Sequence, residues 1–215
     1  MRRHDLELAL RSVADIRKMD PARAIQELHQ IVGQAERAQF QDIVVEAHLD
    51  LFDRYRSQND ARQARAQAEL AFAHVNSVKD VALVARVHFS LGVILTYSEP
   101  TSSQQHLERA LALYRTLGGG SLHVGHTLNA LGLLHACRGE FRTAFEYFTE
   151  CEEIYRPSGN LILLGSVNQC MGEGAIGKNV KSPSSGPNFR WSRFLASSMR
   201  FVYSSNSFWV LKAVP

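Results

Sequence analysis

The chain has 215 residues, of which 45% are hydrophobic, and this is enough to form one large folded domain or two small ones. Its formal net charge is only +3, so bulk charge gives no argument for nucleic acid or a membrane surface as a partner. Three cysteines without a CxxC pair argue against a secreted disulfide framework. No apolar run approaches the roughly 20 residues that span a bilayer, and the N-terminus lacks the apolar core of a signal peptide. The sequence therefore predicts a cytoplasmic protein without a membrane partner.

The first predicted hairpin of helices covers about residues 5–39. Asp20 and Pro21 mark the start of its second helix, because aspartate caps a helix N-terminus and proline is tolerated at the first helical position. Apolar residues then follow at the helical period, at Ala24, Ile25, Leu28, Ile31 and Val32.

From about residue 40 the sequence repeats every forty residues. Four apolar positions keep this spacing, namely Leu51, Leu91, Leu131 and Met171. The residues that follow them are Phe52, Gly92, Gly132 and Gly172. The same phase holds upstream, at Val44, Val84, Val124 and Leu164 and at His48, His88, Leu128 and Asn168. These positions form an i, i+4, i+7 stripe, so each unit is predicted to open with a helix whose buried edge recurs.

The second half of each unit is also helical by pattern. After the turn at residues 138–140, apolar residues recur at the helical period, at Phe141, Ala144, Phe145, Phe148, Cys151 and Ile154. One unit earlier the same pattern is carried by Leu107, Ala110, Leu111 and Tyr114. Three glycines at 118–120 end that helix.

The unit with the clearest pattern carries Leu128, Leu131-Gly132, His135, Gly139, Phe141, Ala144, Phe148 and Cys151. This pattern resembles the tetratricopeptide repeat, in the form of about forty residues found in bacterial regulators and sensors. It departs from the family at His135, where an aromatic residue is expected, and at Cys151, where a small residue is expected. In the unit 40–79, Phe52 stands where the family has a glycine for close packing of helices. The resemblance covers roughly residues 20–179.

The resemblance implies an all-α fold, a right-handed α–α superhelical solenoid of helical hairpins, because one hairpin cannot bury its apolar face alone. We expect hairpins at about 5–39, 40–79, 80–119 and 120–158 and a half repeat at 159–179, within one domain of residues 1–179. Residues 180–215 are expected to form an irregular, basic, serine-rich tail.

In this family the inner surface of the solenoid binds partners, and it is lined by the first helix of each unit. The resemblance places seven residues of this chain there: Arg56, Arg86, Phe89, Tyr97, His126, Asn129 and Gln169. Aromatic side chains can anchor a peptide, and arginine and asparagine can bind its backbone or a carboxylate. The alternative is that these residues are merely solvated. The lysine and asparagine set that clamps a C-terminal carboxylate in some members is not present in matching phase.

Residues 172–179 include G-x-x-x-x-G-K followed by Asn179, which differs by one residue from a phosphate-binding loop. That motif needs a strand before it and a helix after it, but the preceding residues continue a helical stripe and Pro183 and Pro187 follow. A nucleotide-binding enzyme that uses this segment is therefore the less favoured alternative. The sequence predicts no catalytic residue and no cofactor.

His123 and His126 are spaced to share one helix face, with His135 further along, but without a cysteine or carboxylate partner they are a weak signal for zinc, which needs three or four converging ligands. We expect them to be structural, and we expect no metal.

Residues 180–215 contain both tryptophans of the chain and no acidic residue. One hypothesis is a disordered tail that binds nucleic acid through charge and stacking. The favoured one is a shift of reading frame near codon 179, which would make the chain the truncated N-terminal part of a longer protein whose output domain is missing. Helix 161–177 would then lack a covering helix, and self-association through its apolar face is expected.

Taken together, these patterns predict a scaffold that binds a protein or a peptide and is not an enzyme. The role implied by the resemblance is the sensing part of a bacterial signalling or transcriptional regulator.

Overall fold

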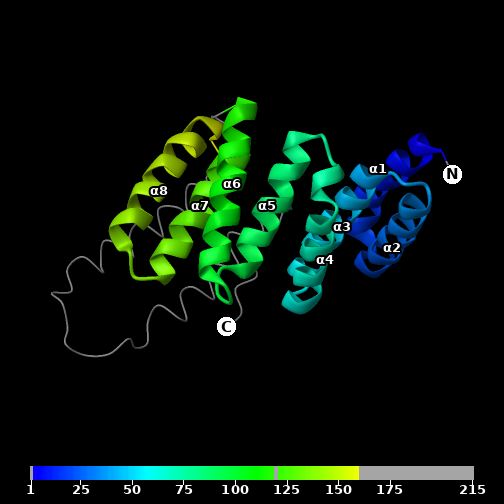
Figure 1. Cartoon of the computed structure of the whole chain (residues 1–215), viewed down its shortest axis with the longest axis horizontal. Coiled ribbons are helices and arrows are strands. Elements are labelled where there is room, and N and C mark those ends of the chain that lie inside the picture. The colour runs from blue at the N-terminus through cyan, green and yellow to red at the C-terminus, as the bar shows by residue number, and fades with distance from the viewer. Residues whose placement is uncertain (1, 119–120, 160–215) are drawn as a thin grey trace. The chain divides into compact units, whose positions relative to one another are not determined.

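The structure is a computed structural model and describes residues 2–118 and 121–159. All regular structure in these ranges is helical, with no strand, which confirms the predicted all-α fold of helical hairpins. The α-helices are α1 Arg3–Met19, α2 Pro21–Arg37, α3 Gln41–Ser57, α4 Ala61–Ala73, α5 Val81–Leu95, α6 Pro100–Gly118, α7 Leu122–Cys137 and α8 Phe141–Tyr155 (Figure 1). Short 3₁₀ turns follow α4 at Val75–Ser77 and α8 at Arg156–Ser158.

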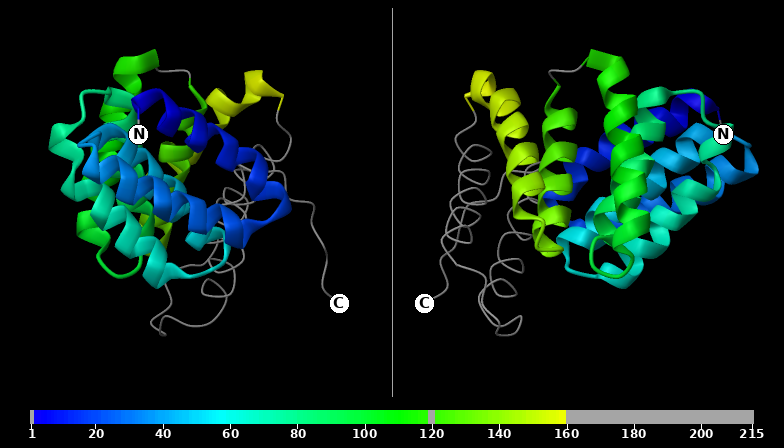
Figure 2. Two further views of the ribbon diagram at one scale, coloured as in Figure 1. Left: turned by 90° about the vertical axis from the view of Figure 1, so that its right-hand side faces the viewer. Right: turned by 60° about the vertical axis from the view of Figure 1, so that its left-hand side comes forward.

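The chain divides into two compact units, Met1–Leu117 and Gly118–Pro215. In the first unit each helix from α1 to α5 packs against the next, and α3 also contacts α5 (Figure 2). In the described part of the second unit, α7 and α8 pack against each other. The sequence segments 160–179 and 180–215, including the half repeat and the tail, lie outside the described residues.

Aspartates begin three of the helices in the first unit. Asp20 accepts a hydrogen bond from the backbone N–H three residues on at 2.9 Å, as predicted, and Pro21 occupies the first helical position. Asp60 makes the equivalent bond at 3.0 Å and Asp80 accepts from Ala82 at 2.8 Å. These side chains satisfy N–H groups that have no partner within the helix, so they fix where α2, α4 and α5 start.

Two of the in-phase glycines allow close packing of helices, as the repeat pattern predicts. A Cβ atom on Gly92 of α5 would lie 2.5 Å from Leu107 Cγ on α6. A Cβ atom on Gly132 of α7 would lie 2.5 Å from Phe148 Cε1 on α8. Both distances are well inside van der Waals contact, so a larger residue at either position would push the two helices apart.

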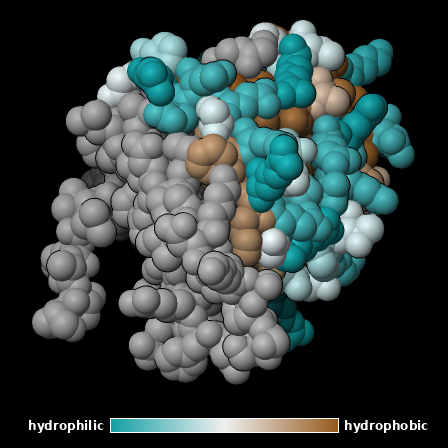
Figure 3. All heavy atoms as spheres, turned by 90° about the vertical axis from the view of Figure 1, so that its left-hand side faces the viewer, coloured by the Kyte–Doolittle hydropathy of each residue, from teal (hydrophilic) through white to brown (hydrophobic). Residues whose placement is uncertain are grey.

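Helix α8 is amphipathic. α8 buries Ala144, Phe148, Cys151 and Tyr155, whereas Arg142 and Glu146 are exposed. Hydrophilic residues also predominate among the described residues on the face drawn in Figure 3. Three of the predicted positions, Ala144, Phe148 and Cys151, are buried. The predicted Phe141, Phe145 and Ile154 are only partly buried, and Tyr155 is buried in addition.

Candidate functional site

The middle of α3 is mostly buried but carries accessible acidic residues on one face. Eight of its residues are buried: Ile43, Val44, Val45, Ala47, His48, Leu49, Leu51 and Phe52. Glu46 is exposed, and Asp50 and Asp53 are partly exposed, at spacings i, i+4 and i+7 that place them on one face. We call these three residues the acidic stripe. Sequence analysis missed it, although acidic residues at helical spacing within an apolar run are a recognisable signal.

Arg86 of α5 joins two members of the acidic stripe. Its Nη2 donates to Asp50 Oδ1 at 2.7 Å and to Asp53 Oδ2 at 2.9 Å. Burial works against the charged guanidinium, but the carboxylates of Asp53 and Asp50 outweigh it and raise the pKa of Arg86 above its ordinary value. The side chain of Arg86 is 32% exposed, so this ion network reaches the surface.

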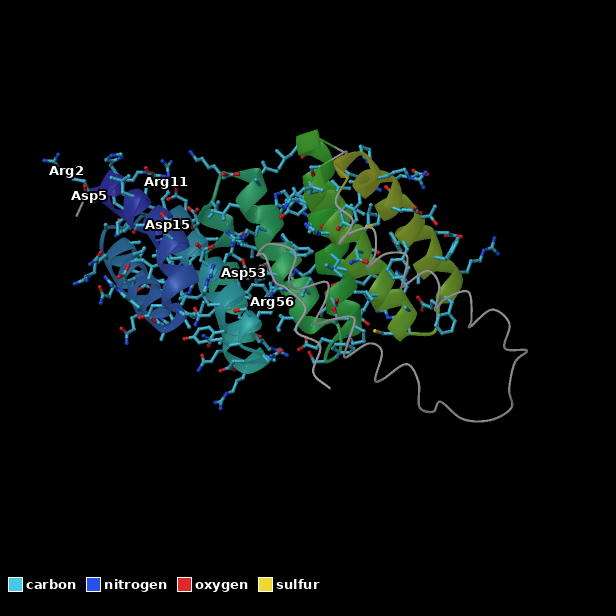
Figure 4. The ribbon with its side chains drawn as sticks, turned by 180° about the vertical axis from the view of Figure 1, so that it is seen from behind. Arg2, Asp5, Arg11, Asp15, Asp53 and Arg56 are labelled. Carbon is cyan, nitrogen blue, oxygen red and sulfur yellow. The ribbon has the colours of Figure 1, made fainter. Side chains whose placement is uncertain are left out.

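Arg56 belongs to the same network. Its Nη2 donates to Asp53 Oδ1 at 3.4 Å, and its guanidinium lies 5.4 Å from the centre of the Phe52 ring. Figure 4 shows Asp53 and Arg56 side by side on α3 (Figure 4). The structure thus brings together two predicted groove residues, Arg56 and Arg86, around an aspartate that the sequence analysis did not select.

Glu46 is the member of the acidic stripe without an ion pair among the described residues. Loss of solvation raises its pKa, and the nearby carboxylate of Asp50 raises it further. Neighbouring Arg86 acts in the opposite direction but does not cancel these effects. Glu46 is therefore a negative charge that the fold leaves only partly compensated.

Two predicted aromatic residues extend this surface along α5. Phe89 lies one turn beyond Arg86 and is partly buried. Tyr97 lies in the turn after the end of α5 and is 55% exposed. The surface of the first unit therefore combines a charged network with an accessible aromatic side chain, and both kinds of group are common at protein interfaces.

Two predicted site residues of the second unit lie on α7, where His126 is hydrogen-bonded and Asn129 is buried. The hydroxyl of Tyr155 on α8 lies 2.7 Å from His126 Nδ1, and their rings are 5.6 Å apart. Asn129 is only 2% exposed, and its Oδ1 has no hydrogen-bond partner within the described residues. Gln169 lies outside the described residues. The seven-residue groove as a whole remains a prediction.

The described residues contain no group of three or more His, Cys, Asp or Glu side chains that could hold a metal ion. His123 is exposed, and buried His135 hydrogen-bonds Glu140 and stacks on Tyr147 at 5.3 Å between ring centres. The segment 172–179, whose sequence is similar to a phosphate-binding loop, lies outside the described residues. Among the helices that the structure describes, none combines the length and the apolar character needed to cross a membrane.

Comparison with known proteins supports the repeat assignment. The family model described as tetratricopeptide repeat matches residues 84–156, a segment that includes α7, α8 and most of the α5–α6 hairpin. This match and the helical fold confirm the resemblance inferred from the Leu-Gly pattern. No curated protein matches the chain significantly.

One similar solved structure is the crystal structure of BtubC (BKLC) from P. vanneervenii. It is 12% identical to this chain, the alignment covers 87% of this chain and 94% of that one, and the TM-score is 0.47. A similarity at this level carries no weight for function.

Proposed function

We propose that this chain binds a protein or peptide segment along the surface formed by the acidic stripe, Arg86, Phe89 and Tyr97. Tetratricopeptide repeats are in general protein-interaction scaffolds, and the matched segment includes three of these residues. The observation that carries the proposal is the packing of α3 beside α5: between Ile43 and Phe52 every residue is buried except Glu46 and Asp50.

The chemistry of this surface favours a peptide over a small molecule. Tyr97 can cover an apolar side chain of the partner, and Phe89 offers a second, less accessible ring. Arg86 and the aspartates hold each other in place, so their remaining hydrogen-bonding capacity is oriented before a partner arrives. Such a surface can bind the amides and charged side chains of an extended chain.

The finer role that we propose is the sensing part of a bacterial signalling or transcriptional regulator, supported by the forty-residue form of the repeat. A cytoplasmic location is proposed on the same basis, and it fits Cys137 and Cys151, which form no disulfide among the described residues. We propose no enzymatic activity.

The alternative of nucleotide binding at residues 172–179 predicts that ATP raises the melting temperature of the wild type but not of Lys178→Ala.

The binding surface is tested by selecting peptides from a phage-displayed random library on the full chain. Affinity for a selected synthetic peptide is then measured by fluorescence anisotropy for the wild type, Tyr97→Ala and Leu70→Ala. Leu70 on α4 is the matched control, because it is also a large exposed apolar residue, at 44% exposure.

We expect Tyr97→Ala to weaken binding by about tenfold or more, as truncation of an aromatic anchor does. Leu70→Ala should leave the affinity unchanged. Equal effects of the two substitutions, or peptides that bind both variants like the wild type, would place the binding surface elsewhere.

A further inference from the structure

Two histidines join the helices of the third hairpin. His88 Nδ1 on α5 lies 2.9 Å from His106 Nδ1 on α6, and the ring centres are 5.2 Å apart. Phe72 of α4 stands edge-on to both rings, with centres 5.7 Å and 5.3 Å away. The pair therefore connects α5 to α6 next to a ring from the preceding hairpin.

The preceding hairpin makes the equivalent connection with different chemistry. His48, forty residues before His88, has its Nδ1 2.8 Å from Oε1 of Gln67 on α4. An amide oxygen accepts a hydrogen bond from Nδ1–H whether the imidazole is neutral or charged. Protonation of His48 therefore leaves the His48–Gln67 hydrogen bond in place, although burial lowers the pKa of His48.

The His88–His106 bond does not have this tolerance. One Nδ1 must carry the hydrogen and the other must offer its lone pair. If one imidazole gains a proton, its Nδ1–H still donates to the neutral partner. If both gain a proton, two N–H groups and two positive charges face each other at hydrogen-bond distance, and the bond is lost.

We propose that the His88–His106 pair is an acid-sensitive joint between α5 and α6, which accepts one proton without damage and opens when it takes up the second. The side chains around the pair favour the same behaviour. Arg109 of α6 adds a positive charge near His88, and α4 contributes the uncharged ring of Phe72. No carboxylate among the described residues acts on either imidazole to stabilise a second charge.

Burial acts in the same direction as the geometry. Loss of solvation lowers the pKa of His88 to about 4, with His106 and Arg109 lowering it as well. Loss of solvation also lowers the pKa of His106. Because both values in the folded chain lie below that of an unfolded histidine, the unfolded chain binds more protons below about pH 6.5. The stabilisation is thus complete above that pH and is lost as the pH falls.

The test measures the unfolding equilibrium constant by urea titration at several pH values between 6 and 4.5. Each additional proton bound on unfolding changes this constant by about tenfold per pH unit. His106→Gln converts the joint to the chemistry of the His48–Gln67 pair. His4→Gln is the control, because His4 is an exposed histidine on α1.

We expect the pH dependence of His106→Gln to be smaller than that of the wild type by about one proton, or roughly tenfold or more in the unfolding constant over this range. His4→Gln should keep the wild-type pH dependence of the unfolding constant. If His106→Gln retains the full wild-type dependence, or if His4→Gln loses as much, the joint does not exist.

A measurement on the unsubstituted chain covers the case in which His106→Gln does not fold. Long-range ¹H–¹⁵N NMR spectra report the protonation of each assigned imidazole. We expect at least one ring of His88 and His106 to remain neutral at pH 4.5 while the chain is folded. Two charged imidazoles in an intact fold would overturn the proposal.

Discussion

The close approach of α5 and α6 at Gly92 makes a quantitative prediction for Gly92→Ala. The new Cβ would lie 2.5 Å from Leu107 Cγ and 3.1 Å from the backbone nitrogen of Leu107. A change of rotamer can relieve the first contact but not the second, so α6 must move. Overpacking of this kind costs about 1–3 kcal/mol. The higher helix propensity of alanine returns about 0.5–1 kcal/mol, so a net loss of roughly 1–2 kcal/mol is expected.

Gly33 of α2 provides a matched control for this substitution. It is also a helical glycine, but a Cβ atom there would meet nothing within 4 Å. Gly33→Ala should therefore show the helix propensity alone and stabilise the chain by about 0.5–1 kcal/mol. The two substitutions are chemically identical and differ only in what faces the added methyl group, so their effects should have opposite signs.

Urea unfolding followed by far-UV circular dichroism measures both free energies. Thermal unfolding should show the same signs, at roughly 2–4 °C per kcal/mol for a chain of this size. The double variant Gly92→Ala/Leu107→Ala should show coupling, because the second change removes the clash with the Leu107 side chain. If Gly92→Ala stabilises the chain as much as Gly33→Ala does, α5 and α6 do not pack as the structure shows, and the reasoning fails.

Two further substitutions test polar groups. Arg86→Leu leaves Asp50 and Asp53 without their bridging cation and should lower the free energy of unfolding by about 1–2 kcal/mol. The loss is smaller than for a fully buried pair because the network is partly exposed. Urea unfolding measures it, and Asp50→Asn in the Arg86→Leu background should recover part of it. His135→Phe removes a buried Nε2 that has no partner among the described residues, but it also removes the hydrogen bond to Glu140. Because the Glu140 side chain is 48% exposed, water can replace that bond, so stability should rise by about 1 kcal/mol and a lower urea midpoint would contradict this.

The sequence predicts those parts of the fold that depend on local periodicity. The helical period and the cap at Asp20 are visible in the residues themselves, and the repeat identifies Gly92 and Gly132 as sites of close approach. Gly125 was missed. A Cβ atom there would lie 2.4 Å from Cε1 of Tyr155, a contact between positions thirty residues apart that the Leu-Gly pattern does not mark.

The candidate site was only partly predictable for a similar reason. The family pattern locates a position such as Arg86 on the first helix of its unit, but it does not say what that side chain contacts. Asp50 and Asp53 become relevant only when α3 and α5 lie next to each other, which is a tertiary property. His126 shows the opposite case, since the hydroxyl of Tyr155 already engages a side chain that the pattern offered for a partner.

The packing around Phe52 explains how a repeat can lack the glycine of the consensus. Gly92 faces Leu107 and Gly132 faces Phe148, so a small residue on the first helix meets a large one on the second. In the unit of α3 and α4 the order is reversed, and Phe52 packs in one cluster with Ala64 and Ala68. A large residue on one helix again meets small residues on the other, and a buried contact constrains mainly the volume that the two sides fill together. The consensus compares single positions, so it marks Phe52 as a departure from the family. The two packed helices show that the large and the small residue have changed places. Contacts between helices therefore define this repeat better than its consensus sequence does.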